Sequence, residues 1–162
     1  MTDDSRENPP NANEGLSRKN SKIIQLNAVP GAAALGLQLL ASSPDCVKLL
    51  DTDGHVRFVN ENGLKLIEVD AYDEIDFKPW SSLWPVESSG IIANAIADAV
   101  NGTVGRFAAI CPTAKGTPKW WDVAVSPVYD DAGKLVWLLA VSRDITRQKQ
   151  IESNFQIGEQ RF

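Results

Sequence analysis

The chain has 162 residues, of which 43% are hydrophobic, and this suits one globular domain with a buried core and flanking segments. The net charge of −5 argues against a nucleic-acid surface, which needs a basic stripe, and no apolar run approaches the ~20 residues that span a membrane. Cys46 and Cys111 lie far apart and His55 is the single histidine, so the sequence predicts neither a zinc knuckle nor a disulfide framework nor another metal site.

The N-terminal part of the chain is polar. Residues 1–22 are rich in Asp, Asn, Ser and Pro and are predicted to be a disordered tail, because they bury too little apolar surface to offset the entropy of ordering. This stretch does not have the features of a signal peptide, which indicates a cytoplasmic protein. Residues 23–43 form an N-terminal flanking segment with a helix over residues 32–41, which Pro44 ends.

A hairpin and a helix are predicted next. Two β-rich runs, residues 47–51 and 55–60, flank the turn at 52–54, which contains the Asp-Gly pair typical of tight hairpins. Residues 60–69 have helical spacing of apolar positions, and residues 78–85 form an irregular aromatic stretch.

The clearest helical pattern covers residues 87–100. Its apolar residues recur at intervals of three and four, which predicts one buried face made of Ile92, Ala95, Ile96, Ala99 and Val100. Three strands follow, at residues 104–111, 119–129 and 134–143. This order predicts an α+β fold, a five-stranded antiparallel sheet with helices on one face.

Several short motifs, in this order and at this spacing, resemble those of a PAS domain. They are Asp51-Thr52-Asp53-Gly54 between the first two strands, Asn60 at the end of the second, Gly116 before the Trp120-Trp121 strand, Ser126-Pro127 at the end of that strand, and Arg143-Asp144-Ile145-Thr146 leading out of the last strand. We therefore assign residues 44–146 to a PAS-like domain and residues 147–162 to a C-terminal signalling helix that leads toward a further module.

The resemblance implies a signal-sensing and signal-transducing module of a two-component system. Such a module passes its state to an output domain in the same polypeptide, here expected to be a histidine kinase beyond residue 162. Arg143, Asp144, Ile145 and Thr146 would form the signal relay, since a short polar side chain can cap the helix that follows. We expect no enzyme activity within the chain, because it contains no nucleophile–base pair, phosphate loop or metal cluster.

PAS domains bind cofactors between the sheet and the helices, and alternation along the strands assigns residues to that inner face. The ligand-binding candidates are Phe107, Cys111, Trp121, Val123, Val125, Leu138 and Ser142, together with Trp84, for which Trp80 is the alternative, and Lys48. A filled aromatic core is the alternative. Lys48 either reaches into the pocket and holds a ligand carboxylate or extends to the edge with its stem on apolar surface, and the second is favoured.

Specific cofactors differ in what they require. Haem PAS domains ligate iron through a histidine on the long helix, and residues 87–100 contain none. Flavin-binding LOV domains carry a reactive cysteine in the helical region before that helix, and residues 60–85 contain none. The resemblance therefore disfavours haem and LOV-type FMN and leaves FAD or a small organic ligand open.

The outer face of the predicted sheet is unusually apolar, with Trp120, Trp137, Leu139 and Val141. Because a monomer rarely leaves such a patch bare, we expect either a second protomer in a homodimer or the N-terminal helix to cover it. A PAS domain that only dimerises and relays, without any ligand, is the alternative function.

Overall fold

The computed structural model describes residues 30–159, so the tail predicted to be disordered lies outside the described residues. The chain divides into two compact units with the boundary between Leu39 and Leu40. Helix α2 (Ala32–Ser42) contains no buried residue and ends two residues before Pro44, as the sequence predicts. No helix within residues 30–159 is both long and apolar enough to cross a membrane.

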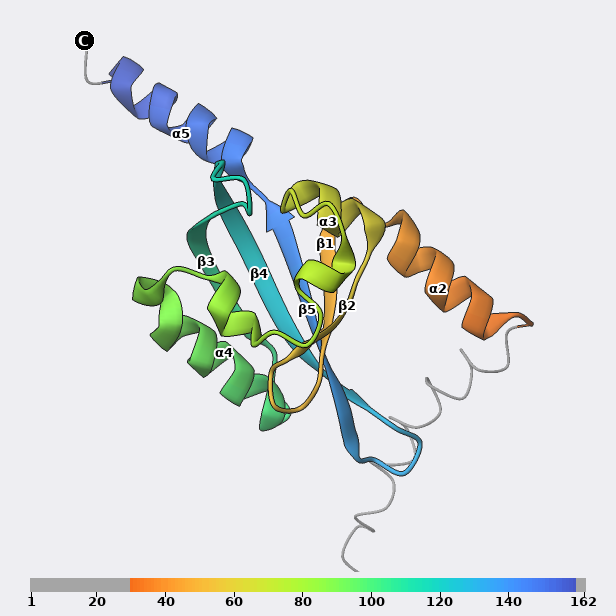
Figure 1. Ribbon diagram of the computed structural model, residues 1–162. Coiled ribbons are helices and arrows are strands. Elements are labelled where there is room, and N and C mark those ends of the chain that lie inside the picture. The colour runs from red at the N-terminus through yellow and green to blue at the C-terminus, as the bar shows by residue number, and fades with distance from the viewer. Residues whose placement is uncertain (1–29, 160–162) are drawn as a thin grey trace, which may run out of the picture. The chain divides into compact units, whose positions relative to one another are not determined.

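The second unit is built on one antiparallel sheet, whose strands lie in the order β2-β1-β5-β4-β3 (Figure 1). The strands are β1 (Cys46–Leu50), β2 (Val56–Val59), β3 (Gly105–Pro112), β4 (Pro118–Tyr129) and β5 (Leu135–Asp144). Every neighbouring pair is antiparallel, and the first and last strands of the sequence pair in the centre of the sheet. The predicted α+β fold with a five-stranded antiparallel sheet is therefore confirmed.

Helical segments between β2 and β3 lie on one side of the sheet, and Figure 1 shows α3 and α4 in front of the strands. The helical segments of this unit are α3 (Glu61–Leu66), η1 (Tyr72–Glu74), η2 (Trp80–Leu83), η3 (Val86–Ser88), α4 (Ser89–Val100) and α5 (Thr146–Glu159). The irregular aromatic stretch of the sequence becomes the 3₁₀ turn η2, and α5 begins two residues after β5 ends.

Helix α3 is shorter than predicted, and its first turn depends on Asn60. The Asn60 side chain is the N-cap, since its Oδ1 accepts a hydrogen bond from the amide of Gly63 at 3.0 Å. The predicted extent to residue 69 was wrong, because the helix ends at Leu66 and Glu68 adopts a left-handed conformation with φ 57°. The apolar residues after Leu66 thus continue as irregular chain.

Helix α4 packs closely on strand β3. Ile92, Ala95 and Ala99 are buried, but Val100 is 43% exposed, so its predicted place on the buried face was wrong. The close approach requires a glycine at position 105, because a Cβ there would lie 2.6 Å from the backbone of Ala95.

The hydrophobic core lies between the inner face of the sheet and these helices. The register places alternate residues of β3, β4 and β5 on this face, as the parity argument predicts. The largest fully buried side chains are Trp80, Leu50, Ile92, Leu138, Val56, Val123, Val125, Asn60 and Cys46.

Asn60 also joins β1 to the chain on either side of it. Its Oδ1 accepts from the amide of Val47 at 2.9 Å, and its Nδ2 donates to the carbonyls of Leu40 and Asp45, each at 3.0 Å. The side chain is 2% exposed, so no water can replace these partners without a rearrangement.

We predict that Asn60→Ala lowers the free energy of unfolding by about 2–4 kcal/mol, because it removes the helix cap and leaves buried backbone groups unpaired. Urea denaturation followed by circular dichroism measures this. Asn62→Ala is the control, since the Asn62 side chain donates one hydrogen bond, to the Ser43 carbonyl at 2.9 Å, and its loss should cost about 1 kcal/mol or less. Equal losses for the two variants would contradict the role given to Asn60.

Candidate functional site

A cavity of about 240 Å³ lies between the inner face of the sheet and the segments that follow α3. Its lining is mostly apolar, with a few polar side chains, and consists of Lys48, Ile67, Val69, Ile75, Trp80, Leu83, Trp84, Cys111, Pro112, Thr113, Ala114, Trp121 and Ser142. An apolar cavity with a few convergent polar groups is the usual form of a small-molecule site.

Aromatic rings form one wall of this cavity. Trp80 and Trp84 meet edge to face with centroids 5.8 Å apart, and Phe107 packs on Trp84 at 5.4 Å. Trp80 is 1% exposed, and the Nε1 of Trp121 donates to the carbonyl of Cys111 at 3.1 Å. These contacts hold the rings in place, so the wall is fixed by packing and does not depend on a ligand.

The structure brings part of the predicted site together. Lys48, Trp84, Cys111, Trp121 and Ser142 lie on the cavity wall. The other candidates lie on the same face but do not line the cavity: Phe107 packs behind Trp80 and Trp84, and Val123, Val125 and Leu138 belong to the core.

Several lining residues were not among the predicted candidates. Ile67 and Val69 were interpreted as part of a longer helix, whereas the early end of α3 turns this chain over the cavity. Thr113 and Ala114 belong to the turn between β3 and β4, and the amide of Ala114 donates to the carbonyl of Ile67 at 2.9 Å. Trp80 had been considered from the sequence as an alternative to Trp84, and the structure places both rings in the lining.

Lys48 lies in the interior. The interpretation that it extends to the edge of the sheet was wrong, because the residue is 4% exposed and its Nζ donates to the Sγ of Cys46 at 2.8 Å. Its neighbours in the sheet explain this, since Cys46 and Lys48 face the same side of β1 as the buried Ala140 and Ser142 of β5.

Cys111 is a buried thiol on the same wall. Its Sγ donates to the carbonyl of Leu83 at 3.2 Å. Burial raises the pKa of the Cys111 thiol, and the positive charge of Lys48 opposes part of that rise. The thiol therefore stays protonated at neutral pH and acts as a weak donor and an apolar surface, which does not suit a nucleophile.

The joint between β5 and α5 is a compact hydrogen-bonded group. The Oδ1 of Asp144 accepts from the hydroxyl and the amide of Thr146 at 2.6 and 3.0 Å. The Oγ1 of Thr146 in turn accepts from the amide of Trp120, and the amide of Ile145 donates to the Trp120 carbonyl. The first turn of α5 is thus tied to the beginning of β4.

Lys119 connects this joint to the end of α3. Its Nζ donates to the carbonyl of Leu66 at 2.8 Å and pairs with Asp144 at 3.2 Å. Burial alone would raise the pKa of the Asp144 carboxyl, but the hydrogen bonds from Thr146 and Lys119 lower it below the ordinary value. Sequence reasoning missed Lys119, because nothing in its local pattern distinguishes it from other strand lysines.

Arg143 points away from this group. Its guanidinium pairs with Asp45 at 3.4 Å across β5 and β1 and is largely exposed. Such a surface pair contributes little to stability.

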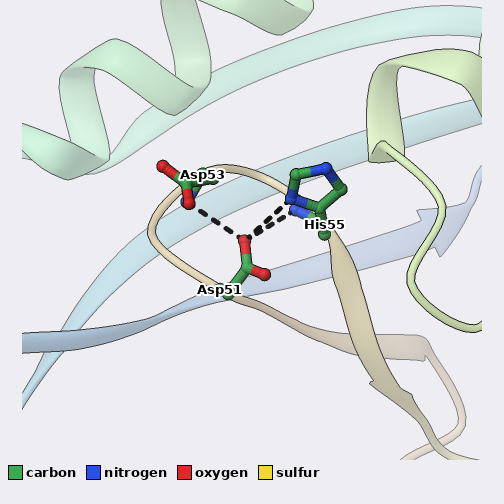
Figure 2. A group of neighbouring side chains, drawn as sticks. All are labelled: Asp51, Asp53 and His55. Carbon is green, nitrogen blue, oxygen red and sulfur yellow. Dashed lines mark hydrogen bonds and ion pairs between the residues drawn. The ribbon is translucent and has the colours of Figure 1, made fainter.

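Asp51, Asp53 and His55 form the one group of possible metal ligands found among residues 30–159 (Figure 2). The Oδ1 of Asp51 accepts from the amides of Asp53 and His55 and lies 3.4 Å from the His55 ring. Burial would raise the pKa of the Asp51 carboxyl, but these hydrogen bonds lower it. Hydrogen bonding within the hairpin turn therefore accounts for the arrangement. His55 is half-buried, and its ring stacks on that of Phe77 with centroids 5.1 Å apart.

The outer face of the sheet carries the predicted apolar patch. Trp137 is 36% exposed, while Trp120, Leu139 and Val141 are half-buried. On α5, Ile151 is 59% exposed.

Comparison with known families and structures identifies the fold. A protein-family model described as "PAS fold" matches residues 40–150. No curated protein matches the chain.

Solved structures agree with this match. The PAS domain of a protein from Colwellia psychrerythraea is 17% identical with a TM-score of 0.64, over 71% of this chain and 98% of that one. A domain of a sensory box sensor histidine kinase/response regulator from Geobacter sulfurreducens is 22% identical with a TM-score of 0.59, over 69% and 93%. An RNA-binding light-oxygen-voltage receptor is 17% identical with a TM-score of 0.66, over 95% of this chain and 41% of that one. At these identities the likeness concerns the fold alone.

We predict that Asp144→Asn lowers the free energy of unfolding by about 1–2 kcal/mol at pH 7, because it removes a charged hydrogen-bond acceptor. A carboxyl with a lowered pKa stabilises the folded state above its unfolded pKa of about 3.9 and loses this effect as the pH falls through the folded value. The difference in the free energy of unfolding between wild type and variant, measured by urea denaturation, should therefore become smaller as the pH falls from about 5 to about 2.

Asp131→Asn is the matched control, since Asp131 is exposed in the turn between β4 and β5. It should change stability little at any of these pH values. A difference for Asp144→Asn that stays constant with pH would show that the carboxylate charge is not what stabilises the joint.

Proposed function

The chain belongs to the PAS fold family, and we propose that it is a signal-sensing module that binds a small molecule in its cavity and relays the bound state through α5. The carrying observation is the cavity of about 240 Å³ with a rigid aromatic wall and a buried lysine. A cavity and a buried charge each lower the stability of a fold. Their presence together therefore favours a binding function over a purely structural one.

The volume of the cavity narrows the class of ligand. Clefts that hold drug-sized molecules measure roughly 300–1,000 Å³, and this cavity is slightly below that range. This favours a metabolite with a single ring over a haem or a complete flavin nucleotide. Among the candidates left open by the sequence, a small organic ligand is therefore preferred to FAD.

The route from the cavity to α5 is short. Trp121 lines the cavity. The backbone amide of its neighbour Trp120 donates to the Thr146 hydroxyl, and the Trp120 carbonyl accepts from the amide of Ile145. Lys119 links the end of α3 to Asp144 on the same side. A ligand that prefers one position of the start of β4 would shift the first turn of α5, and this difference in affinity is what transmission requires.

The output domain is proposed to be a histidine kinase in the same polypeptide, acting in the cytoplasm. The similar structure from Geobacter sulfurreducens, a domain of a sensor histidine kinase/response regulator, supports this choice. The exposed apolar side chains of α5, Ile151 and Phe155, suit a helix that pairs with a second copy.

We predict that native mass spectrometry of the purified chain detects a bound small molecule as extra mass on the protomer. Ser142→Leu should abolish it, because the larger side chain fills the cavity that Ser142 lines. Circular dichroism checks that the variant is folded, and Thr113→Val is a milder second variant. If the wild-type chain carries no extra mass, and no compound of a metabolite library changes its melting temperature, the ligand-free relay function would be favoured.

We predict that the chain forms a homodimer through the outer face of the sheet, so that Trp137→Lys weakens association by about tenfold or more. Sedimentation equilibrium measures this. Val104→Lys is the control, since Val104 is similarly exposed at 46% but precedes β3 and lies outside the patch. Unchanged association in Trp137→Lys would exclude this face as the interface.

A further inference from the structure

We propose that the ligand of the cavity is a small monocarboxylate with an apolar body, and that Lys48 binds its carboxylate. This inference rests on the proposed function, because it names the chemical class of the molecule that the cavity takes. It is carried by the charges and the free polar atoms around the cavity, and by the apolar character of the remaining wall.

Lys48 is a buried cation without a carboxylate partner. The residue is 4% exposed, and the hydrogen bond of its Nζ within residues 30–159 goes to the thiol of Cys46, a weak acceptor. An ammonium group has three donors, so two remain for another molecule. A buried charge is costly unless it is paired, and lysine is almost never fully buried without a partner.

The cavity wall supplies no anion for this cation. Lys48 is the one charged residue among the described residues that line the cavity, and no aspartate or glutamate is found there. The nearby acidic residue Asp70 is exposed and pairs with Lys115. An anionic ligand would therefore provide the missing counter-charge, and the protein would bind it more tightly than a neutral analogue of the same shape.

Ser142 provides a second polar contact for the same group. It is 3% exposed and lines the cavity, and its hydroxyl forms no hydrogen bond with another residue of 30–159. Lys48 pairs with Ala140 and Cys46 pairs with Ser142, so Lys48 and Ser142 are diagonal neighbours on one face of the sheet. Diagonal neighbours lie about 7–8 Å apart. A carboxylate placed between the two side chains can therefore accept from the Lys48 ammonium with one oxygen and from the Ser142 hydroxyl with the other.

The rest of the wall is apolar and aromatic apart from the hydroxyl of Thr113 and the thiol of Cys111. Trp80, Trp84 and Trp121 belong to it, and the body of the ligand would lie against these rings. A second charge on the ligand would find no partner among these rings, so a dicarboxylate or a phosphate ester would lose more by desolvation than it gains. The expected ligand thus carries one carboxylate and a single ring or a short branched chain.

The test compares an acid with its neutral analogue. Phenylacetate and phenylacetamide have nearly the same shape, and succinate adds a second charge. Isothermal titration calorimetry measures each probe against the wild-type chain, Lys48→Met and Lys65→Met. Methionine keeps the length and volume of the lysine stem without its charge, and Lys65 is an exposed lysine on α3 that pairs with Glu61, outside the cavity.

We expect wild type and Lys65→Met to bind phenylacetate about tenfold or more tightly than phenylacetamide, and to bind succinate weakly or not at all. Lys48→Met should lose the preference for the acid while its affinity for the amide changes less than about threefold. In the absence of ligand, the urea midpoint of Lys48→Met should lie above that of wild type, because the variant no longer buries an unpaired charge.

The outcomes separate this inference from the function on which it rests. Equal binding of the acid and the amide, with both lost in Ser142→Leu, would overturn the carboxylate assignment and leave the small-molecule sensor intact. A preference for the acid that persists in Lys48→Met would also overturn it, since another group would then bind the carboxylate. Absence of binding by all three probes, together with apo protein in native mass spectrometry, would overturn both.

Discussion

The hydrogen bonds of one buried amide, the side chain of Asn60, hold together the parts that form the site. Its oxygen fixes the start of β1 through Val47 and caps α3 through Gly63, while its nitrogen binds the carbonyls of Leu40 and Asp45. Because β1 lies in the centre of the sheet beside β5, its position decides which side chains enter the interior. Cys46 and Lys48 stand on either side of the fixed Val47, so both side chains point to the opposite face of β1, where Lys48 lines the cavity.

The cavity is a result of where α3 ends. A helix continued to residue 69 would place its apolar side chains along one straight face, whereas the left-handed Glu68 redirects the chain across the sheet. Ile67 and Val69 then line a space that Trp80, Trp84 and Trp121 close from other directions. The packing of α4 on β3 at Gly105 is tight, so the space beside Lys48 does not extend between these two elements.

The two buried or half-buried lysines of this region differ in their partners: Lys119 lies at the joint between β5 and α5, and Lys48 lies in the cavity. At the joint, Lys119 has a carboxylate partner in Asp144, and the pKa of that carboxyl lies below its ordinary value. In the cavity, the hydrogen-bond partner of Lys48 among residues 30–159 is a thiol. The charge of Lys119 is already paired, so we assign the Lys119–Asp144 pair to the relay. The charge of Lys48 can still be paired by a ligand, so we assign Lys48 to binding.

The sequence by itself determined the order of the elements, the antiparallel sheet and the two faces of its strands, because these follow from local periodicity and turn chemistry. Residues such as Trp121 and Ser142 were placed on the inner face by parity, and the motif Arg143-Asp144-Ile145-Thr146 marked the exit. Neither the burial of Lys48 nor the partnership of Lys119 with Asp144 could be predicted, since each depends on residues distant in the chain. Only the tertiary structure decided which inner-face residues line the cavity. A cavity depends on how several elements pack together, so the sequence pattern of a single strand or helix does not reveal it.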